Sequence, residues 1–395
     1  MNNNFKPVIL GIDVGAYSVA RCIYEHYNIK SIIVGKYKYW MTSYSNITEV
    51  LTIDDMTEDK LIDFLIDLKK DYQDTKLLLF GCSEDYVEII IRNKEKLMDS
   101  YIIPMIDYDT LLKVSSKEGF YEICEKAKIN YPKTLVVNKD NYKELDIPFR
   151  TPFIGKVSNK AKYQRISFVG KEKVFLFNSK EEYLLAMDRC FAAGYDDTVV
   201  IQEYIKGTDA NMRVLTCFAN QDSEVIFSSV GRVLLEEKGP DVTGNYSAIY
   251  NTQDDKIVEA AKRFIKETKY VGYANFDIKY DDETGEFYFF EVNVRLGRSN
   301  FYMGAGNTNY LAPLIDTFIY ENPKEEYKQN GCELYRIVPN YVINKYVKDK
   351  DILKLVKKLK RNNPLDYHKD FSFKRKYYII GALINHIRKF RKYYE

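Results

Sequence analysis

The part of the sequence that decides the fold is a pair of strand-like runs, Tyr273-Ala-Asn-Phe-Asp-Ile-Lys279 and Phe289-Phe-Glu-Val-Asn-Val-Arg-Leu-Gly-Arg298. The turn-forming segment Asp281-Asp-Glu-Thr-Gly285 lies between them. Side chains alternate between two faces along a strand, so each run has one apolar face and one polar face. The pair therefore predicts a β-hairpin over residues 273–280 and 286–294, with its apolar face packed into a core.

The polar face of this hairpin brings three oxygen-bearing side chains together. Asp277 lies on the first strand, and Glu291 and Asn293 share a face of the second. Carboxylate and amide oxygens suit Mg²⁺, with phosphate oxygens at its other positions. Arg295 and Arg298 follow as cations for phosphate or carboxylate oxygens. A solvated surface hairpin is the alternative, but it explains poorly why an asparagine and an arginine follow Glu291.

Upstream of the hairpin, the pattern is typical of an α/β protein. Val8-Ile-Leu-Gly11, a helix over 16–27 and Ser31-Ile-Ile-Val34 predict a βαβ unit, and apolar runs at 77–80 and 101–104 extend a parallel sheet. We expect a first domain at 1–110, a second at 111–330 and a basic extension at 331–395.

A helix is expected where the second domain begins. Ser115 and Glu118 have the spacing of a capping box, which predicts that this helix begins at Ser115 and runs to about Lys128. Lys117 then falls in the first turn, where the helix dipole favours a nearby anion. A solvated lysine is the commoner case for any one such residue.

Two further lysines flank the next expected strands. Lys156 ends the apolar run that begins at Phe153. A cation at the end of a buried strand costs free energy unless an anion or solvent contacts it. Lys173 precedes a strand expected at 174–177 and is placed to face the same site. Lys171 is equally exposed on sequence grounds, so a solvated role for Lys173 stays open.

The segment Gln202-Glu-Tyr-Ile-Lys-Gly-Thr-Asp209 leaves a strand and turns at Gly207. Such a segment offers the backbone groups of Glu203, Tyr204 and Ile205 to an adenine edge, and Asp209 is placed to accept from ribose hydroxyls. A plain strand and turn is the alternative when this segment is considered alone.

Taken in chain order, these elements resemble the ATP-grasp superfamily over about residues 5–320. They are the βαβ unit, Ser116-Lys-Glu-Gly-Phe120, Ile154-Gly-Lys156, Gln202-Glu-Tyr-Ile-Lys-Gly207, Asp277 and Glu291-Val-Asn293. The resemblance implies a mixed α/β and α+β fold, in which a Rossmann-like pre-ATP-grasp domain precedes a two-lobed ATP-grasp fold. A small nucleotide lobe is expected at about 130–205 and a metal and substrate lobe at about 206–330.

The resemblance also implies ATP and Mg²⁺ as cofactors and assigns roles to individual residues. The residues expected at ATP are Lys117, Lys156, Lys173, Gln202, Glu203, Tyr204, Ile205 and Asp209. Asp277, Glu291 and Asn293 are the expected metal ligands, and Arg232, Arg295 and Arg298 are the expected catalytic cations. Two features depart from the family pattern: Val157 replaces a frequent proline, and residues 158–168 lack glycine.

Within the superfamily, three segments resemble the bacterial D-aspartate ligases. They are Phe290-Glu-Val-Asn-Val-Arg-Leu-Gly-Arg-Ser-Asn-Phe-Tyr302, Gly231-Arg-Val-Leu-Leu-Glu236 and Gly244-Asn-Tyr246. This resemblance implies that an amino-acid carboxylate is activated as an acyl phosphate and passed to an amine, here the lysine side chain of a peptidoglycan precursor. Asp241 is a candidate general base, although an ordinary turn aspartate explains it better.

Three other functions stay open from the residues. They are a related ligase that makes a different amide or peptide bond, a non-catalytic nucleotide-binding regulator, and a dinucleotide-dependent oxidoreductase. The intact Asp277, Glu291 and Asn293 set argues against the regulator. Gly11-Ile-Asp-Val-Gly15 does not match G-x-G-x-x-G, which argues against the oxidoreductase.

The composition limits the kinds of functional site that the protein can contain and indicates its location. The net charge is +2, and three histidines leave little for a histidine-based site, so carboxylates, lysines and arginines must carry any chemistry. Six cysteines without a C-x-x-C pair predict buried, reduced thiols and a cytoplasmic location. The sequence shows neither a signal peptide nor an apolar run long enough to span a membrane.

The C-terminal extension is strongly basic, and an apolar segment, Ile379-Ile-Gly-Ala-Leu-Ile384, lies among its lysines and arginines. A peripheral membrane contact is one interpretation, and nucleic-acid binding is a second, less favoured one. The interpretation we favour is a solvated helix whose Ile380, Leu383, Ile384 and Ile387 pack on the body of the protein.

Overall fold

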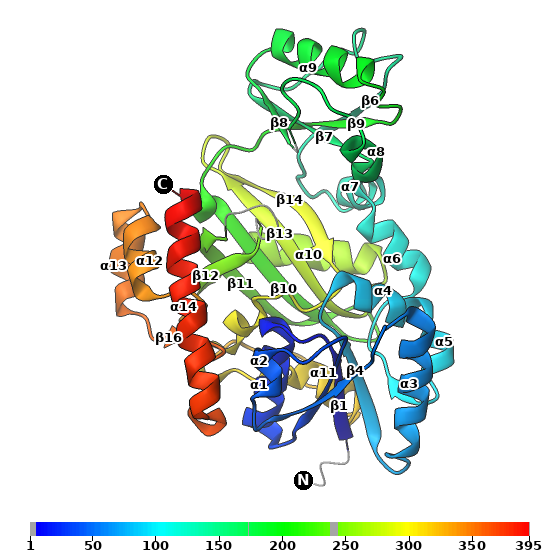
Figure 1. Cartoon of the computed structure of the whole chain (residues 1–395), viewed down its shortest axis with the longest axis vertical. Coiled ribbons are helices and arrows are strands. Elements are labelled where there is room, and N and C mark those ends of the chain that lie inside the picture. The colour runs from blue at the N-terminus through cyan, green and yellow to red at the C-terminus, as the bar shows by residue number, and fades with distance from the viewer. Residues whose placement is uncertain (1–4, 173, 238–243, 395) are drawn as a thin grey trace. The chain divides into compact units, whose positions relative to one another are not determined.

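The structure, a computed structural model, describes residues 5–172, 174–237 and 244–394 (Figure 1). The chain forms two compact units. Unit 1 contains Met1–Ile129, Thr208–Lys279 and Glu291–Glu395, and unit 2 contains Asn130–Gly207 and Tyr280–Phe290. The sequence-based boundaries near residues 110 and 330 stay a prediction. No helix in the described ranges is long and apolar enough to cross a membrane.

Unit 1 begins with the predicted parallel sheet, whose five strands have the order β3-β2-β1-β4-β5. Its elements are β1 (Phe5–Leu10), α1 (Val14–Tyr27), β2 (Ser31–Gly35), α2 (Trp40–Ser43), β3 (Thr48–Thr52), α3 (Glu58–Lys70), β4 (Lys76–Gly81), α4 (Glu84–Arg92), α5 (Lys94–Leu97) and β5 (Tyr101–Ile102). The buried aliphatic residues of β1, β2 and β4 explain why these strands were predictable. β3 was missed because Thr-Glu-Val-Leu-Thr contains no continuous apolar run.

The helix predicted from Ser115 to Lys128 is in fact two helices, α6 (Tyr108–Ser115) and α7 (Lys117–Lys126). The predicted capping box is wrong, because Ser115 ends α6. Ser116 is the N-cap of α7, and its side chain accepts from the backbone N–H of Gly119 at 3.0 Å. A Cβ on Gly119 would lie 2.1 Å from the carbonyl oxygen of Lys113, so the sharp junction requires glycine.

A seven-stranded sheet with the order β14-β13-β10-β11-β12-β15-β16 follows. Its elements are η1 (Asp209–Asn211), β10 (Met212–Ala219), β11 (Val225–Glu236), β12 (Tyr246–Thr252), α10 (Asp255–Glu267), β13 (Gly272–Asp281), β14 (Glu286–Asn293), η2 (Asn300–Asn307) and α11 (Ala312–Phe318). The predicted hairpin is therefore confirmed as β13 and β14. Phe276 of β13 packs against Phe264 of α10, with 5.2 Å between ring centroids. This contact buries the apolar face of β13 and leaves the opposite face to its polar residues.

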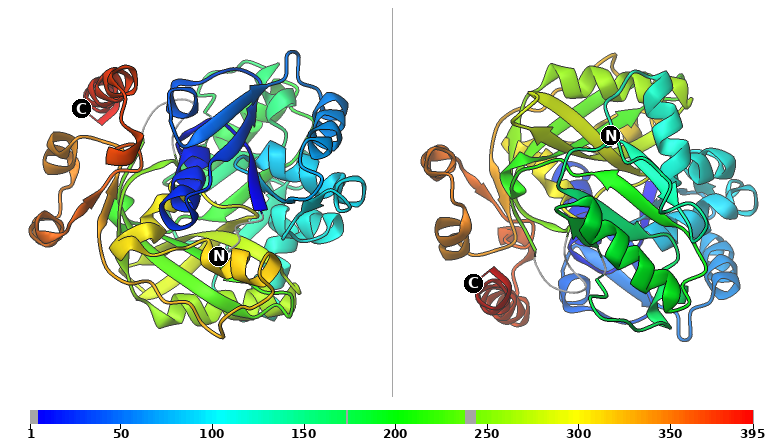
Figure 2. Two further views of the ribbon diagram at one scale, coloured as in Figure 1. Left: turned by 90° about the horizontal axis from the view of Figure 1, so that it is seen from below. Right: turned by 90° about the horizontal axis from the view of Figure 1, so that it is seen from above.

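The basic extension completes this sheet. Its elements are β15 (Leu334–Arg336), α12 (Asn340–Tyr346), α13 (Lys350–Lys358), β16 (Arg361–Asn362), η3 (His368–Asp370) and α14 (Phe373–Tyr394). β15 pairs with β12, and β16 pairs with β15. α12, α13 and α14 lie on the opposite side of unit 1 from α3 and α5 (Figure 2).

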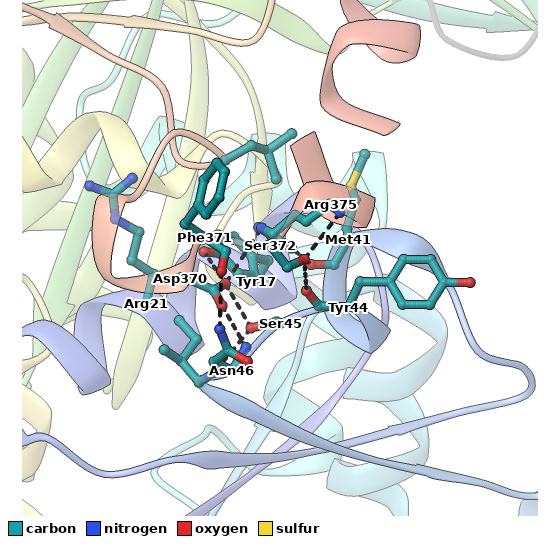
Figure 3. Close-up of polar contacts among 12 residues, drawn as sticks. Tyr17, Arg21, Met41, Tyr44, Ser45, Asn46, Asp370, Phe371, Ser372 and Arg375 are labelled. Carbon is teal, nitrogen blue, oxygen red and sulfur yellow. Dashed lines mark hydrogen bonds and ion pairs between the residues drawn. The ribbon is translucent and has the colours of Figure 1, made fainter. Parts of the chain in front are cut away.

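A buried polar cluster joins the start of α14 to α1 and to the segment between α2 and β3 (Figure 3). Asp370, only 2% exposed, accepts hydrogen bonds from the hydroxyls of Tyr17 and Ser45, both at 2.8 Å, and from the backbone N–H of Asn46. The guanidinium of Arg375 lies 4.1 Å from the centroid of the Tyr17 ring and 3.5 Å from Asp370 Oδ2. The extension is thus an integral part of unit 1.

Unit 2 contains a four-stranded antiparallel sheet with the order β6-β9-β7-β8. Its elements are β6 (Thr134–Val137), β7 (Phe153–Val157), α8 (Lys160–Gln164), β8 (Phe175–Phe177), α9 (Lys180–Ala192) and β9 (Val199–Glu203). Tyr183 of α9 packs against Phe153 and Phe177. Ser179 caps α9 by accepting from the backbone N–H of Glu182 at 3.2 Å.

Candidate functional site

The structure brings the three predicted metal ligands together at the β13–β14 edge of the sheet. Asn293 Nδ2 donates to Asp277 Oδ2 at 3.3 Å, and the Glu291 side chain is within hydrogen-bonding range of Asp277. Asp277 is paired in register with Val214 of β10. Because Phe276 and Ile278 are buried on the other face, strand alternation directs Asp277 toward Glu291 and Asn293.

The carboxylates of Asp277 and Glu291 repel each other in this cluster. Burial and the adjacent charge of Glu291 raise the pKa of Asp277 to about 8, although a hydrogen bond from Tyr246 acts in the opposite direction. The Tyr246 hydroxyl donates to Asp277 Oδ1 at 2.8 Å. A cation would relieve this repulsion, since it favours the ionised form of both carboxylates.

The donor set fits a magnesium ion that is shared with phosphate. Asp277, Glu291 and Asn293 offer hard oxygen atoms, which Mg²⁺ prefers, but only two of the three are charged. Within the described part of the chain, no group of three or more His, Cys, Asp or Glu side chains is arranged to hold a metal. The set therefore resembles a site that a nucleotide completes and differs from an all-protein metal cage.

The predicted cations Arg295 and Arg298 follow β14 in unit 1. Arg295 makes an ion pair of 2.9 Å with Glu84, and its buried Nε has no hydrogen-bond partner among the residues that the structure describes. Arg298 makes a 3.0 Å ion pair with the buried Glu237 and lies 3.6 Å from Asp13. The cation of Arg298 is thus held by carboxylates from two different parts of the chain.

A glycine allows the loop that carries Arg298 to approach the start of α1. A Cβ on Gly15 would lie 3.3 Å from the Cα of Arg298 and 3.2 Å from the side chain of Asp13. Asp13 is itself fixed as the N-cap of α1 and accepts from the backbone N–H groups of Gly15 and Ala16. The βαβ unit therefore helps to position Arg298.

Arg232 lies on β11, paired in register with Arg213 of β10. Its Nε donates to the carbonyl oxygen of Ala210 at 3.0 Å, which ties β11 to η1. Asp209, at the start of η1, accepts the backbone N–H of Glu236 at 3.0 Å. Arg232 and Asp209 are therefore linked through one short segment of unit 1.

The other residues predicted to contact ATP are divided between the units. Lys117 is the first residue of α7 in unit 1. Unit 2 contains Lys156 on β7, Gln202 and Glu203 on β9, and the following residues Tyr204 and Ile205. Gln202 is buried and donates to the Thr134 hydroxyl at 3.1 Å, so its side chain is engaged in the strand. Lys173 and Asp241 lie outside the described residues.

Three residues with close contacts to the candidate site were not predicted for it. The Tyr246 hydroxyl donates to Asp277, and Glu237 accepts from Arg298. Tyr394 of α14 donates to Asp209 Oδ2 at 2.7 Å. Tyr246 belongs to the segment Gly244-Asn-Tyr246, whose resemblance to the D-aspartate ligases is the one sequence signal that could have found it. Nothing in the sequence relates Tyr394 to Asp209.

Comparison with known proteins identifies the family of the chain. Residues 114–299 match the family described as an ATP-grasp domain. The whole chain aligns with D-aspartate ligase from Enterococcus faecium (strain Aus0004) at 32% identity, over 97% of that protein. The chain belongs to the ATP-grasp family. It is an ADP-forming ligase that joins a carboxylate to an amine.

The ATP-grasp fold of the chain also recurs in solved structures. Phosphoribosylglycinamide synthetase from Anaerococcus prevotii matches with a TM-score of 0.57 and 18% identity, over 84% of this chain and 80% of that chain. L-amino acid ligase from Bacillus licheniformis matches with a TM-score of 0.58 and 13% identity, over 86% and 81%. At such identities the likeness concerns the fold alone, and it confirms the predicted ATP-grasp architecture.

Proposed function

We propose that this ATP-grasp ligase attaches D-aspartate to the lysine side chain of a peptidoglycan precursor. The supporting observation is the alignment with D-aspartate ligase over the full chain, because it includes the C-terminal extension that the ATP-grasp domain match does not reach. The six cysteines are all free, which supports a cytoplasmic reaction.

We assign the nucleotide contacts residue by residue. Lys117, Lys156 and Lys173 contact phosphates, Glu203, Tyr204 and Ile205 contact adenine beside Gln202, and Asp209 contacts ribose. Asp277, Glu291 and Asn293 hold Mg²⁺, which neutralises charge on the outer phosphates when bound. The repulsion between Asp277 and Glu291, which a bound cation would offset, supports this assignment.

The reaction then needs positioning and charge stabilisation from the protein. A carboxylate oxygen of the amino acid attacks the γ-phosphorus, so that an acyl phosphate forms and ADP leaves. The amine of the acceptor attacks the acyl carbon, inorganic phosphate leaves, and a proton is lost from the nitrogen. Arg232, Arg295 and Arg298 stabilise the negative charge at the transferred phosphate and at the acyl phosphate.

The alternative within the family is a different carboxylate or a different amine. A screen of ADP release distinguishes them: D-aspartate, L-aspartate, D-asparagine and D-alanine are each tested with a lysine-containing peptidoglycan precursor. We expect ADP release, and a product heavier by one aspartyl residue, with D-aspartate alone. Turnover with another amino acid and none with D-aspartate would reject the proposed substrate and leave the ligase assignment intact.

Glu291→Gln tests the proposed metal site. We expect a loss of about 10²–10³ in kcat, because removal of one well-placed electrostatic group commonly has that effect. Glu286→Gln is the matched control, since Glu286 lies on the same strand and is exposed. Normal ADP formation by Glu291→Gln would reject this metal assignment.

A further inference from the structure

An apolar stripe lies on the outward face of the C-terminal helix α14. Phe373, Tyr377, Ile380 and Ile384 are 85%, 75%, 48% and 46% exposed. Their spacing of three or four residues places them on one side of a helix. Phe371, just before the helix, is 52% exposed and its ring lies 5.4 Å from that of Phe373. An extended run of exposed aromatic and aliphatic side chains marks an interaction surface.

The opposite side of α14 is packed against unit 1, so the outward direction of the stripe is well defined. Arg375 is buried in the Asp370 cluster (Figure 3). Tyr378 stacks on Trp40 with 5.9 Å between ring centroids. Phe390 is buried and stacks on Tyr394 at 4.6 Å. Our expectation that Ile380 and Ile384 pack on the body of the protein is therefore wrong, because Arg375 and Phe390 face inward instead. The same expectation is confirmed for Ile387, which packs against the core, and Leu383 is half-buried.

The charges on this helix have one sign. In its 22 residues α14 contains Lys374, Arg375, Lys376, Arg388, Lys389, Arg391 and Lys392 and no aspartate or glutamate. Arg388 and Arg391 continue the line of the apolar stripe toward the C-terminus, and Lys374 and Lys376 flank its beginning. An apolar stripe bordered by cations is complementary to a surface with an apolar interior and anionic head groups.

We propose that this face of α14 binds the surface of an anionic lipid bilayer. Phe373, Tyr377, Ile380 and Ile384 enter the boundary between head groups and acyl chains, and the flanking cations contact lipid phosphates. A single-stranded nucleic acid fits less well, because the isoleucines offer no flat surface on which bases stack. This surface is independent of the ligase reaction, so either proposal can fail without the other.

Vesicle flotation of the full chain tests the proposal. We expect binding to vesicles that contain phosphatidylglycerol and little binding to pure phosphatidylcholine. The double variant Phe373→Ser/Ile380→Ser should lower the partition constant at least about tenfold, since it removes two apolar side chains from the interface. The variant Arg388→Gln/Arg391→Gln should lower it by about fivefold for each cation removed.

Leu185→Ser is the matched control, because Leu185 is a 52% exposed apolar residue on helix α9 of unit 2. It should bind vesicles like the unchanged chain, and all variants should release ADP normally with soluble substrates. Three results would overturn the proposal: equal binding to neutral and anionic vesicles, vesicle binding that survives both double variants, or displacement of vesicles by single-stranded nucleic acid. Self-association that Phe373→Ser/Ile380→Ser abolishes, without any vesicle binding, would assign the face to a second copy of the chain.

Discussion

The Tyr394 hydroxyl lies 2.7 Å from Asp209 Oδ2, although the two residues are 185 positions apart in the sequence. The same carboxylate oxygen accepts the backbone N–H of Glu236 at 3.0 Å. The last turn of α14 therefore helps to hold the carboxylate that we assign to the ribose of ATP. The C-terminal helix thus has an inner face that supports the proposed site and an exposed outer face that we propose to bind lipid.

Tyr394→Phe should weaken ADP binding about tenfold without unfolding the protein, because a hydrogen bond to a charged group contributes about 1.5 kcal/mol or more. Isothermal titration of Mg-ADP measures the effect. Tyr393→Phe is the control, since the neighbouring Tyr393 is 40% exposed. Unchanged ADP affinity in Tyr394→Phe, alongside a clear loss in Asp209→Asn, would show that Tyr394 does not position Asp209.

The stability of the metal-free protein should fall as pH rises from about 4 to about 8. The pKa of Asp277 is raised from its ordinary 3.8 to about 8 in the folded state, by burial and by Glu291. The folded state therefore holds a proton that the unfolded state has already released in this range, so the free energy of unfolding decreases with pH. Urea unfolding at several pH values measures this trend.

Asp277→Asn is the control for this pH dependence, because an amide does not titrate, and its stability should vary less over the same range. Mg-ADP binding to the unchanged chain should release protons below pH 8, since a bound cation favours the ionised carboxylate. Calorimetry in buffers of different ionisation enthalpy detects this release. A binding reaction without proton release, in both proteins, would contradict the raised pKa of Asp277.

Tyr246→Phe should shift the pH dependence of catalysis upward. The Tyr246 hydroxyl donates to Asp277 and lowers its pKa, so its removal raises that pKa further. We expect the acidic limb of the kcat/KM profile to move to higher pH, while kcat at high pH changes little. A uniform loss of activity at all pH values would instead indicate a structural role for Tyr246.

Asp370→Ala should destabilise unit 1 by about 3–5 kcal/mol, because it leaves the buried Arg375 without its carboxylate partner. Urea unfolding compares this variant with Asp366→Ala, whose side chain is exposed. Equal stability of the two variants would mean that the cluster in Figure 3 contributes little to attachment of the C-terminal helix.

Local pattern alone predicted the elements that carry the core of the site. The alternating apolar and polar residues of β13 and β14 specified which side chains share a face, so Asp277, Glu291 and Asn293 could be grouped without a structure. The start of α7 could not be predicted as well. Ser115 and Ser116 both resemble caps, and only the junction at Gly119 selects Ser116.

The sequence by itself determined the ATP-grasp fold and the carboxylate hairpin, because strand alternation and turn residues act over a few positions. Only the tertiary structure decided that Tyr394 meets Asp209, that Arg298 lies between Glu237 and Asp13, and which side of α14 faces outward. These contacts join residues far apart in the chain, and their geometry depends on how helices and strands pack. No local pattern of residue types encodes that packing.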